Sequence, residues 1–383
     1  MSDEIRFSLP DIGEAEVEAA TRALTSGWIT TGGECLALEQ ELAQHLGVEH
    51  VVAVSSCTAA LEIAVAHLGL PRGARVGVPT WTFVATATAA FHRGLIPVLL
   101  DVEPATFNLS ADSLVAALDE TPGLDAVIGV HFAGTPLSAE IHDICRTRGV
   151  PLIEDAAHAL GASDHRGRVA GQGTAGCCYS FYATKNLTSA EGGALATDDR
   201  ELAEFAQSFR LHGMSRDAWK RYAPGNRALN YDLLGDGLKA NLPDVLAAIA
   251  RVQLDRFEGL QKRRRQLLEL YRATLDDVDG LSFVPSEVPA GGADHLMMVL
   301  LPPGTDRDVV QERLRDEAIG TSVHFRPLHE FRWFAEHGVA PGPAGVEVAT
   351  AHAPRALSLP FHTRLTDADV DRVCTALRRA LAG

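Results

Sequence analysis

Two residues that could carry cofactor chemistry lie thirty positions apart in the sequence. Lys185 lies in the segment SFYATKN, residues 180–186, and Asp155 lies in IEDAAH, residues 153–158. A lysine amine can form a Schiff base with an aldehyde, and a carboxylate can keep a pyridine nitrogen protonated. These two groups are the minimum that a protein must add to pyridoxal phosphate to make its ring an electron sink. The chain has only four lysines among 34 basic residues, so a lysine in this motif is informative.

A turn rich in hydroxyl groups could bind the phosphate of such a cofactor. Residues 51–54 predict a strand, residues 55–57 a turn, and Thr58 opens a predicted helix that runs to Leu68. The free N–H groups and the dipole of a helix N-terminus favour a dianionic phosphate. Serine and threonine are also ordinary helix N-caps, so this turn alone does not establish a phosphate site.

Seven short apolar runs predict an α/β fold with a mainly parallel seven-stranded sheet between helices. Amphipathic stretches such as residues 111–118 and 139–148 separate the runs, as in a sheet covered on both faces. Ligands of such sheets bind beyond the carboxyl ends of the strands, where Trp81, Asp155 and Lys185 fall. The apolar runs are residues 51–54, 74–79, 97–102, 125–131, 151–156, 177–182 and 193–197.

The pattern changes after Pro243, where a long helical stripe covers residues 244–275. A smaller α+β unit is predicted beyond it, with strands near residues 295–301 and 321–324 and helices near residues 307–317 and 367–381. We therefore expect a large cofactor-binding domain, residues 1–250 with the N-terminal segment, and a small C-terminal domain, residues 251–383.

Composition excludes several classes of protein. A chain of 383 residues with 46% hydrophobic content can bury a large core. The formal net charge of −16 argues against binding to nucleic acid or to an anionic membrane, since both need a basic surface. No apolar run approaches the ~18 residues of a membrane span, and the N-terminus has no basic region that leads into an apolar run. We expect a cytoplasmic protein.

Two motifs that suggest other chemistry are rejected. The six cysteines form no C-x-x-C pair and are too scattered for a disulfide framework, so we expect no metal site. The segment GQGTAG, residues 171–176, satisfies the dinucleotide pattern G-x-G-x-x-G. That pattern requires a helix after it, whereas the next segment here is a predicted strand.

The ordered motifs resemble those of the DegT/DnrJ family of pyridoxal phosphate-dependent sugar aminotransferases, a branch of the aspartate aminotransferase superfamily with fold type I. The resemblance runs almost from end to end of the chain. It is specific for the family and much less so for the substrate. The matching motifs are SGWITTG (26–32), VSSCTAAL (54–61), PTWTFVAT (79–86), IEDAAH (153–158), SFYATKN (180–186), EGG (191–193), LHGMSRDAWK (211–220) and SVHF (322–325).

The resemblance implies roles around the cofactor ring. Lys185 is similar to the Schiff-base lysine, which also acts as general acid and base. Asp155 would pair with the pyridinium nitrogen, and His158 would face the 3-hydroxyl group of the ring. Trp81 would stack on the ring. A buried aspartate needs a cationic partner, and burial of Lys185 beside a cation would lower the pKa of its amine, so both assignments are physically consistent.

The resemblance also implies a phosphate site that two subunits share. Cys57 and Thr58 at the helix start, with Ser180, would bind the phosphate. A further contact would come from the partner subunit, where Asn241 occupies the expected position and Lys239 is the less favoured candidate. The catalytic unit would then be a homodimer with shared active sites.

Candidate substrate contacts are less specific. His324 and His329 could bind sugar hydroxyls or a diphosphate, although either could be a structural histidine. Trp219 and Arg221 offer the aromatic and cationic groups that a nucleotide diphosphate needs, although their segment could be a solvated loop.

These features predict an aminotransferase that moves an amino group, expected to come from L-glutamate, to a nucleotide-diphosphate-linked keto-deoxysugar. The cofactor would cycle between pyridoxal phosphate and pyridoxamine phosphate, with ping-pong kinetics. Two alternatives stay open. One is the same chemistry on a cyclitol ketone of the inosose type, and the other is a non-catalytic cofactor-binding or regulatory protein that kept the fold.

Overall fold

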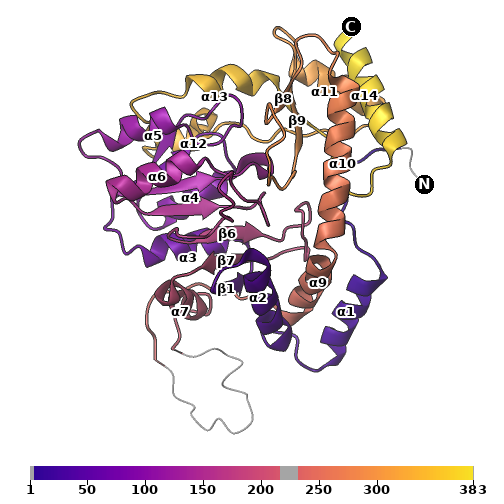
Figure 1. The fold of residues 1–383 in the computed structure, drawn as a ribbon. Coiled ribbons are helices and arrows are strands. Elements are labelled where there is room, and N and C mark those ends of the chain that lie inside the picture. The colour runs from indigo at the N-terminus through magenta and orange to yellow at the C-terminus, as the bar shows by residue number, and fades with distance from the viewer. Residues whose placement is uncertain (1–3, 216–231, 383) are drawn as a thin grey trace.

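A sheet of eight strands forms the centre of the molecule (Figure 1). The computed structural model describes residues 4–215 and 232–382. The strand order is β1-β7-β6-β5-β4-β2-β3-β10. The strands are β1 (His50–Val54), β2 (Arg75–Pro79), β3 (Ile96–Leu100), β4 (Ala126–Val130), β5 (Leu152–Asp155), β6 (Cys177–Ser180), β7 (Gly193–Thr197) and β10 (Ala340–Pro341).

The sheet is mainly parallel. Strands β3, β2, β4, β5 and β6 pair in parallel, whereas β7 runs antiparallel to both of its neighbours, β6 and β1. The predicted α/β class and the seven predicted strands are confirmed. The edge strand β10, parallel to β3, was not predicted, because two residues carry no periodic pattern.

Helices cover both faces of this sheet. Helices α3, α4 and α7 pack on one face, and α2, α9, α5 and α6 pack on the other. The adjacent residues Cys177 and Cys178 belong to different cores, because neighbouring strand residues point to opposite faces. The helices are α2 (Gly33–Leu46), α3 (Cys57–His67), α4 (Val84–His92), α5 (Ala111–Leu118), α6 (Ala139–Arg148), α7 (Arg200–Phe209) and α9 (Asp244–Asp255).

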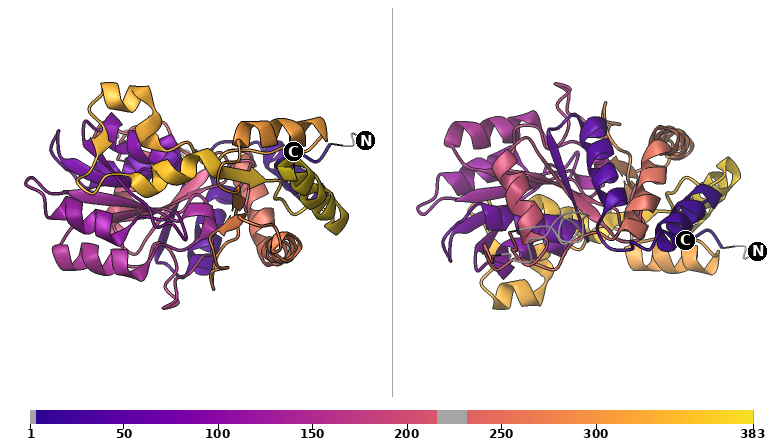
Figure 2. Two further views of the ribbon diagram at one scale, coloured as in Figure 1. Left: turned by 90° about the horizontal axis from the view of Figure 1, so that it is seen from above. Right: turned by 90° about the horizontal axis from the view of Figure 1, so that it is seen from below.

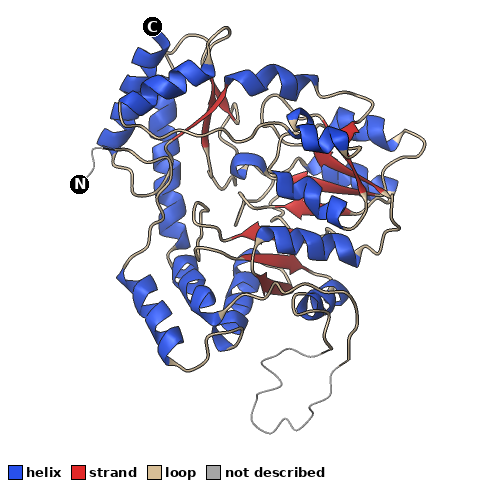
Figure 3. Cartoon of the chain, turned by 180° about the vertical axis from the view of Figure 1, so that it is seen from behind, coloured by secondary structure: helices blue, strands red, loops and turns tan. Residues whose placement is uncertain are grey.

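A second, antiparallel sheet with the order β11-β9-β8 lies to one side of the first (Figures 2 and 3). Helices α10, α11 and α14 share a hydrophobic core with it. These elements are β8 (Ser282–Val284), β9 (Met297–Leu300), β11 (Ala356–Leu359), α10 (Phe257–Leu275), α11 (Arg307–Asp316) and α14 (Asp367–Ala382). The remaining elements are α1 (Glu14–Thr25), α12 (Arg332–Glu336), α13 (Glu347–His352) and the short 3₁₀ turns Phe132–Gly134, Leu328–Glu330 and Ala353–Arg355.

Two predicted elements differ in detail. The helical stripe of residues 244–275 forms two helices, α9 and α10, separated at Arg256. The predicted strand at residues 321–324 is wrong: only Ser322 pairs, in an isolated bridge with Ser358. The single residue pair exchanges both backbone hydrogen bonds, and no further ladder forms beside it.

A segment from the opposite end of the chain lies beside each of the two sheets. Ile5, near the N-terminus, pairs with Ile319 and packs in the core that surrounds the small sheet. Strand β10, from the C-terminal third of the chain, extends the large sheet. The division at residues 250 and 251 stays a proposal, supported by the change from α9, which packs on α1 and α2, to α10, which packs on α14.

The part of the chain that the structure describes contains no helix long and apolar enough to cross a membrane. Within the same residues, no cluster of three or more His, Cys, Asp or Glu side chains is placed to hold a metal ion. All six cysteines are free and buried.

The carboxylate of Asp244 joins the starts of α2 and α9. It accepts hydrogen bonds from the backbone N–H groups of Gly32 at 2.7 Å, Cys35 at 3.1 Å and Glu34 at 3.2 Å. The first N–H groups of a helix have no acceptor inside the helix, so Asp244 satisfies three donors that would otherwise be buried or half-buried without partners.

We expect Asp244→Ala to lower the free energy of unfolding by about 1–3 kcal/mol, because it leaves these donors without acceptors. Urea denaturation followed by circular dichroism measures the change. Glu312→Ala is the matched control, since Glu312 is an exposed acidic residue within α11. Equal stability of the two variants would contradict the capping role.

Candidate active site

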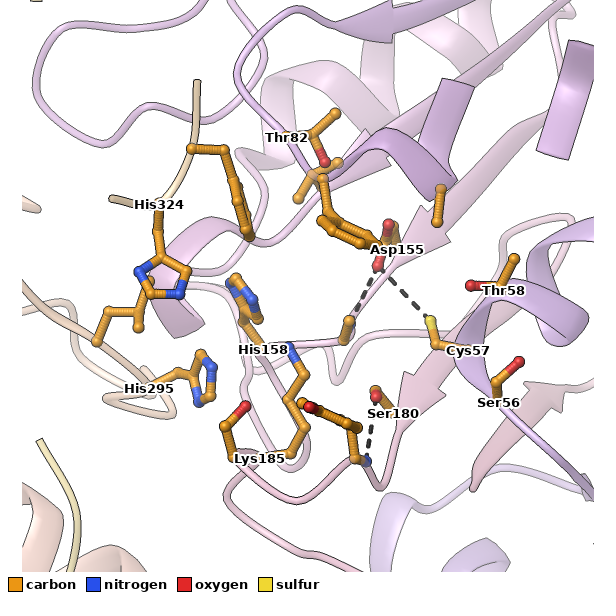
Figure 4. A pocket seen from close by; sticks show the side chains of 18 of the residues that line it. Ser56, Cys57, Thr58, Thr82, Asp155, His158, Ser180, Lys185, His295 and His324 are labelled. Carbon is orange, nitrogen blue, oxygen red and sulfur yellow. Dashed lines mark hydrogen bonds between the residues drawn. The ribbon is translucent and has the colours of Figure 1, made fainter. Parts of the chain in front are cut away.

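A cavity of about 580 Å³ opens at the carboxyl ends of β1, β5 and β6, between the two sheets (Figure 4). The large sheet contributes the start of α3, the end of β5 and the turn after β6. The small sheet side contributes residues 295–296 and 322–325. The cavity brings together six of the predicted residues and one predicted substrate contact: Cys57, Thr58, Asp155, His158, Ser180, Lys185 and His324.

Asp155 ends β5 and is buried, with 6% of its surface exposed. Its Oδ2 accepts a hydrogen bond from the Thr86 hydroxyl at 2.8 Å, and its Oδ1 accepts from the Ala157 N–H at 3.2 Å and faces the Cys57 thiol at 3.8 Å. Among the described residues no cationic side chain forms an ion pair with it. A buried carboxylate held only by neutral donors is matched by a cationic group in the cavity, such as a protonated pyridine nitrogen.

Lys185 lies in the turn that follows β6 and lines the cavity near Asp155. Burial lowers the pKa of its amine to about 8, against the opposing effect of the Asp155 carboxylate. A much larger fraction of the amine is therefore neutral near pH 7 than in an exposed lysine. Only the neutral amine is nucleophilic, so this environment suits attack on an aldehyde.

His158 is a neutral imidazole of defined tautomer. Burial lowers the pKa of His158 well below its usual range, and the charge of Lys185 lowers it further. Its Nδ1 faces the backbone N–H of Ala133 at 3.3 Å. A backbone N–H can only donate, so Nδ1 accepts and the proton resides on Nε2. The ring stacks on Phe325, with 5.9 Å between the ring centroids.

The start of α3 has the groups that an anion site needs. Ser56 caps the helix through its hydroxyl, which accepts from the Ala59 N–H at 3.1 Å. The N–H groups of Cys57 and Thr58 occupy the first helical positions, which have no acceptor within the helix. These amides, the Thr58 hydroxyl and Ser180 line the same end of the cavity, as a phosphate group requires.

Gly193 allows this turn to lie close to the sheet. A Cβ atom at this position would lie 2.6 Å from the backbone nitrogen of Cys57 and 2.6 Å from the carbonyl oxygen of Tyr179. No side chain fits there. The glycine at the start of β7 thus lets the helix N-terminus approach the end of β6, which carries Ser180.

Trp81 does not lie where the sequence analysis expected it. Its side chain is fully buried outside the cavity lining, its indole N–H donates to the carbonyl oxygen of His324 at 3.0 Å, and its ring packs on Phe107. A ring without exposed surface cannot stack on a cofactor. Phe83, two residues later, is 56% exposed and lines the cavity instead. Both aromatic residues lie in one short motif, and only the fold shows which of the two rings faces the cavity.

Four other predicted contacts are not among the described residues that line the cavity. His329 does not line the cavity: its two ring nitrogens contact the hydroxyls of Thr80 at 2.8 Å and Thr350 at 3.1 Å, so it is a structural histidine. Asn241 also lies outside the cavity of its own chain, where its amide donates to Thr31 at 2.7 Å. Trp219 and Arg221 lie outside the described residues.

Sequence reasoning missed several residues. Thr86 and Thr82 form the hydrogen-bonded pair that supports Asp155, and they lie in the motif PTWTFVAT, whose only signal was the family resemblance. His295 lines the cavity and lies 4.3 Å from His158 between ring centroids. A single histidine at the start of a predicted strand does not by itself indicate a site residue.

A mainly parallel sheet with a buried lysine, an unpaired buried aspartate and a helix N-terminus at its carboxyl edge defines the class of fold type I pyridoxal phosphate enzymes. The family model of the DegT/DnrJ/EryC1/StrS aminotransferase family matches residues 10–378. The chain belongs to this family, as the resemblance predicted, and is an aminotransferase that depends on pyridoxal phosphate.

Solved structures agree with this assignment. The chain is similar to Spr1654 from Streptococcus pneumoniae, described as a sugar aminotransferase and solved in its PMP form, with 28% identity over 99% of both chains and a TM-score of 0.90. It is similar to the aminotransferase TlmJ from Streptoalloteichus hindustanus, with 34% identity over 99% of both chains and a TM-score of 0.89. It is also similar to DesI, solved in the presence of its TDP-sugar product, with 32% identity, coverage of 100% of this chain and 94% of that one, and a TM-score of 0.85.

We expect Gly193→Ala to weaken binding of pyridoxal phosphate and to lower the free energy of unfolding by about 1–3 kcal/mol, because the added methyl group displaces the turn before α3. Absorbance titration of the apoprotein measures the affinity. Gly259→Ala is the control, since an added Cβ there meets nothing within 4 Å and alanine favours the helix. Unchanged affinity in Gly193→Ala would show that the turn tolerates displacement.

Proposed function

We propose that the chain transfers an amino group from L-glutamate to the keto carbon of a nucleotide-diphosphate-linked deoxysugar. The observation that carries the proposal is the buried Lys185 amine, with its lowered pKa, beside the buried Asp155 carboxylate in one cavity. The similarity to DesI, solved with a TDP-sugar product, supports the nucleotide sugar as acceptor. Residues 295–296 and 322–325, on the side of the small sheet, line the part of the cavity in which a sugar would lie.

The described residues fit pyridoxal phosphate group by group. Asp155 would hold the proton of the pyridine nitrogen, and His158 would donate its Nε2–H to the ring oxygen. Phe83, rather than Trp81, would cover one face of the ring. Cys57 and Thr58 backbone amides would bind the phosphate. When bound, the cofactor supplies an aldehyde that accepts the amino group and a ring that withdraws electrons.

Lys185 would perform the proton transfers. As a neutral amine it would remove the proton from the α-carbon of the donor, and as an ammonium it would give that proton to the carbon that carried the aldehyde. Water would then release the donor as its 2-oxo acid. In the second half of the reaction the same amine moves a proton onto the carbon that was the ketone. The donor product leaves before the acceptor binds, so the kinetics would be ping-pong.

The phosphate site would be completed in a homodimer. Asn241, or alternatively Lys239 beside it, would reach the phosphate of the partner subunit. The Lys239 amine and the Asn241 amide oxygen are hydrogen-bonded to each other, so both belong to one polar group near the end of β1. For the acceptor, His324 lines the cavity, and Trp219 and Arg221 stay candidates for the nucleotide diphosphate.

Lys185→Ala should abolish turnover, because Lys185 is the only lysine among residues 4–215 and 232–382 that lines the cavity and could exchange the proton. The absorption spectrum of the bound cofactor, before and after addition of L-glutamate, measures the donor half of the reaction. The wild type should lose the absorbance of the aldehyde form, and the variant should not. Lys262→Ala is the matched control, since Lys262 is exposed on α10. A fully active Lys185→Ala variant would overturn the mechanism.

The acceptor is tested with the amine form of the wild type. TDP-4-keto-6-deoxyglucose and scyllo-inosose are added separately, and return of the aldehyde absorbance is followed. Return of the aldehyde absorbance with the nucleotide sugar supports the proposal. Return with the inosose alone would show that the enzyme is a cyclitol aminotransferase. Failure of the wild type to react with any amino donor would favour a non-catalytic cofactor-binding protein.

Capture of pyridoxal phosphate by the apoprotein should depend on pH through Lys185. The rate should rise as the amine loses its proton and level off above a midpoint of about 8, the value to which burial lowers its pKa. Asp155→Asn should move the midpoint to lower pH, because the Asp155 carboxylate stabilises the ammonium form of Lys185 and the variant lacks it. Stopped-flow absorbance measures both profiles. A midpoint near the ordinary value of 10.5 would contradict the buried amine.

A further inference from the structure

A second histidine, His295, lies in the cavity with its ring beside that of His158 (Figure 4). It precedes β9 of the small sheet and is 4% exposed. Its ring lies 4.3 Å from the His158 ring, at an interplanar angle of 31°. None of the roles described so far uses this side chain.

The amide of Asn186 fixes the tautomer of His295. The carbonyl oxygen of Ala293 can only accept, and it lies 2.5 Å from the Asn186 amide nitrogen and 2.9 Å from the Gln261 amide nitrogen. The Asn186 nitrogen also donates to the Gln261 oxygen at 2.9 Å. Both amide orientations are therefore set by a backbone carbonyl, and the oxygen of Asn186 must face His295.

The Asn186 oxygen lies 2.7 Å from Nδ1 of His295. Since this oxygen can only accept, Nδ1 carries the proton and Nε2 has a free lone pair. Burial lowers the pKa of His295 well below its usual range, and the neighbouring His158 and Lys185 lower it further, so the ring is neutral. Within residues 4–215 and 232–382, Nε2 has no hydrogen-bond partner.

The two neighbouring histidines therefore present opposite hydrogen-bonding groups at their Nε2 atoms. His158 accepts at Nδ1 from the Ala133 N–H and presents a donor at Nε2, whereas His295 donates at Nδ1 and presents an acceptor at Nε2. Ala133 also ties the two segments together, because its carbonyl oxygen accepts from the His295 backbone N–H at 2.9 Å. The Nε2–H of His158 would donate to the ring oxygen of the cofactor, which leaves the Nε2 acceptor of His295 without an assigned partner.

The geometry points to His295 as a substrate-binding residue, whose unprotonated Nε2 accepts a hydrogen bond from a hydroxyl group of the keto acceptor, with Asn186 as the residue that sets its tautomer. This assignment rests on the proposed function, since it requires an acceptor that carries hydroxyl groups. Sugars and cyclitols both do. The α-amino acid donor L-glutamate has no hydroxyl group, so the contact belongs to the second half of the reaction only.

The tautomers are tested without any reaction. In protein labelled with ¹⁵N-histidine, one- and two-bond couplings show which ring nitrogen carries the proton. We expect Nδ1–H for His295 and Nε2–H for His158 in the apoprotein, with the His295 signals identified by their absence in His295→Asn. A proton on Nε2 of His295, or a charged ring at pH 7, would overturn the inference whatever the substrate is.

Two variants separate recognition from structure. His295→Asn keeps a polar atom near the Asn186 oxygen and removes the acceptor at the ε position, whereas His295→Gln places an amide oxygen near that position. We expect His295→Asn to leave the donor half reaction with L-glutamate within about threefold and to lower kcat/KM for the acceptor by about 10- to 100-fold. His295→Gln should recover part of this loss. His92→Asn, at an exposed histidine, is the control.

The acceptor hydroxyl is identified with TDP-4-keto-6-deoxyglucose and its 2-deoxy and 3-deoxy analogues, or with scyllo-inosose and its deoxy analogues where the cyclitol is the active acceptor. One analogue should be about 10- to 100-fold poorer than the parent with the wild type and nearly equal to it with His295→Asn. Equal losses in both half reactions, or in cofactor affinity, would show a merely structural role. A wild type that fails to react with L-glutamate would instead count against the proposed function.

Discussion

The structure depends on a carboxylate that is buried without a cation of its own. Asp155 is held by a hydroxyl, a backbone N–H and a thiol, which orient it but do not neutralise it. Each donor comes from a different segment: α4, the turn after β5, and the first residue of α3. The carboxylate therefore holds three elements together, and a cationic cofactor ring would give it the ion-pair partner that no described side chain supplies.

The catalytic segment is tied to the small sheet by the residue next to the lysine. Asn186 contacts Ala293, His295 and Gln261, the last of which lies on α10. The position of Lys185 thus depends on contacts from both sheets. Asn186, the neighbouring rings of His158 and His295, and Gln261 of α10 form one connected set of contacts, although they come from distant parts of the chain.

The sequence contained enough to predict the large sheet and the polar residues at its edge. Buried parallel strands have continuous apolar runs, and Lys185, Asp155 and the turn before α3 follow such runs directly, so order along the chain determines position in space. Trp81 and Phe83 show where this reasoning ends. They lie two residues apart in a loop. The Trp81 ring contacts Phe107 and the backbone of residue 324, whereas the Phe83 ring contacts Phe325, and these partners are distant in sequence. His295 and Asn186 were not found for the same reason, since their roles come from contacts with each other.

The six cysteines have a practical consequence. All of them are buried, and burial raises the pKa of each thiol, so none is a ready nucleophile in the folded protein. A thiol reagent would then report on opening of the core, except at Cys57, which lines the cavity. Two cysteines introduced at exposed sites, one beside each sheet, could carry a pair of labels without removal of the native ones, and the distance between the two sheets could be followed in solution as donor and acceptor alternate.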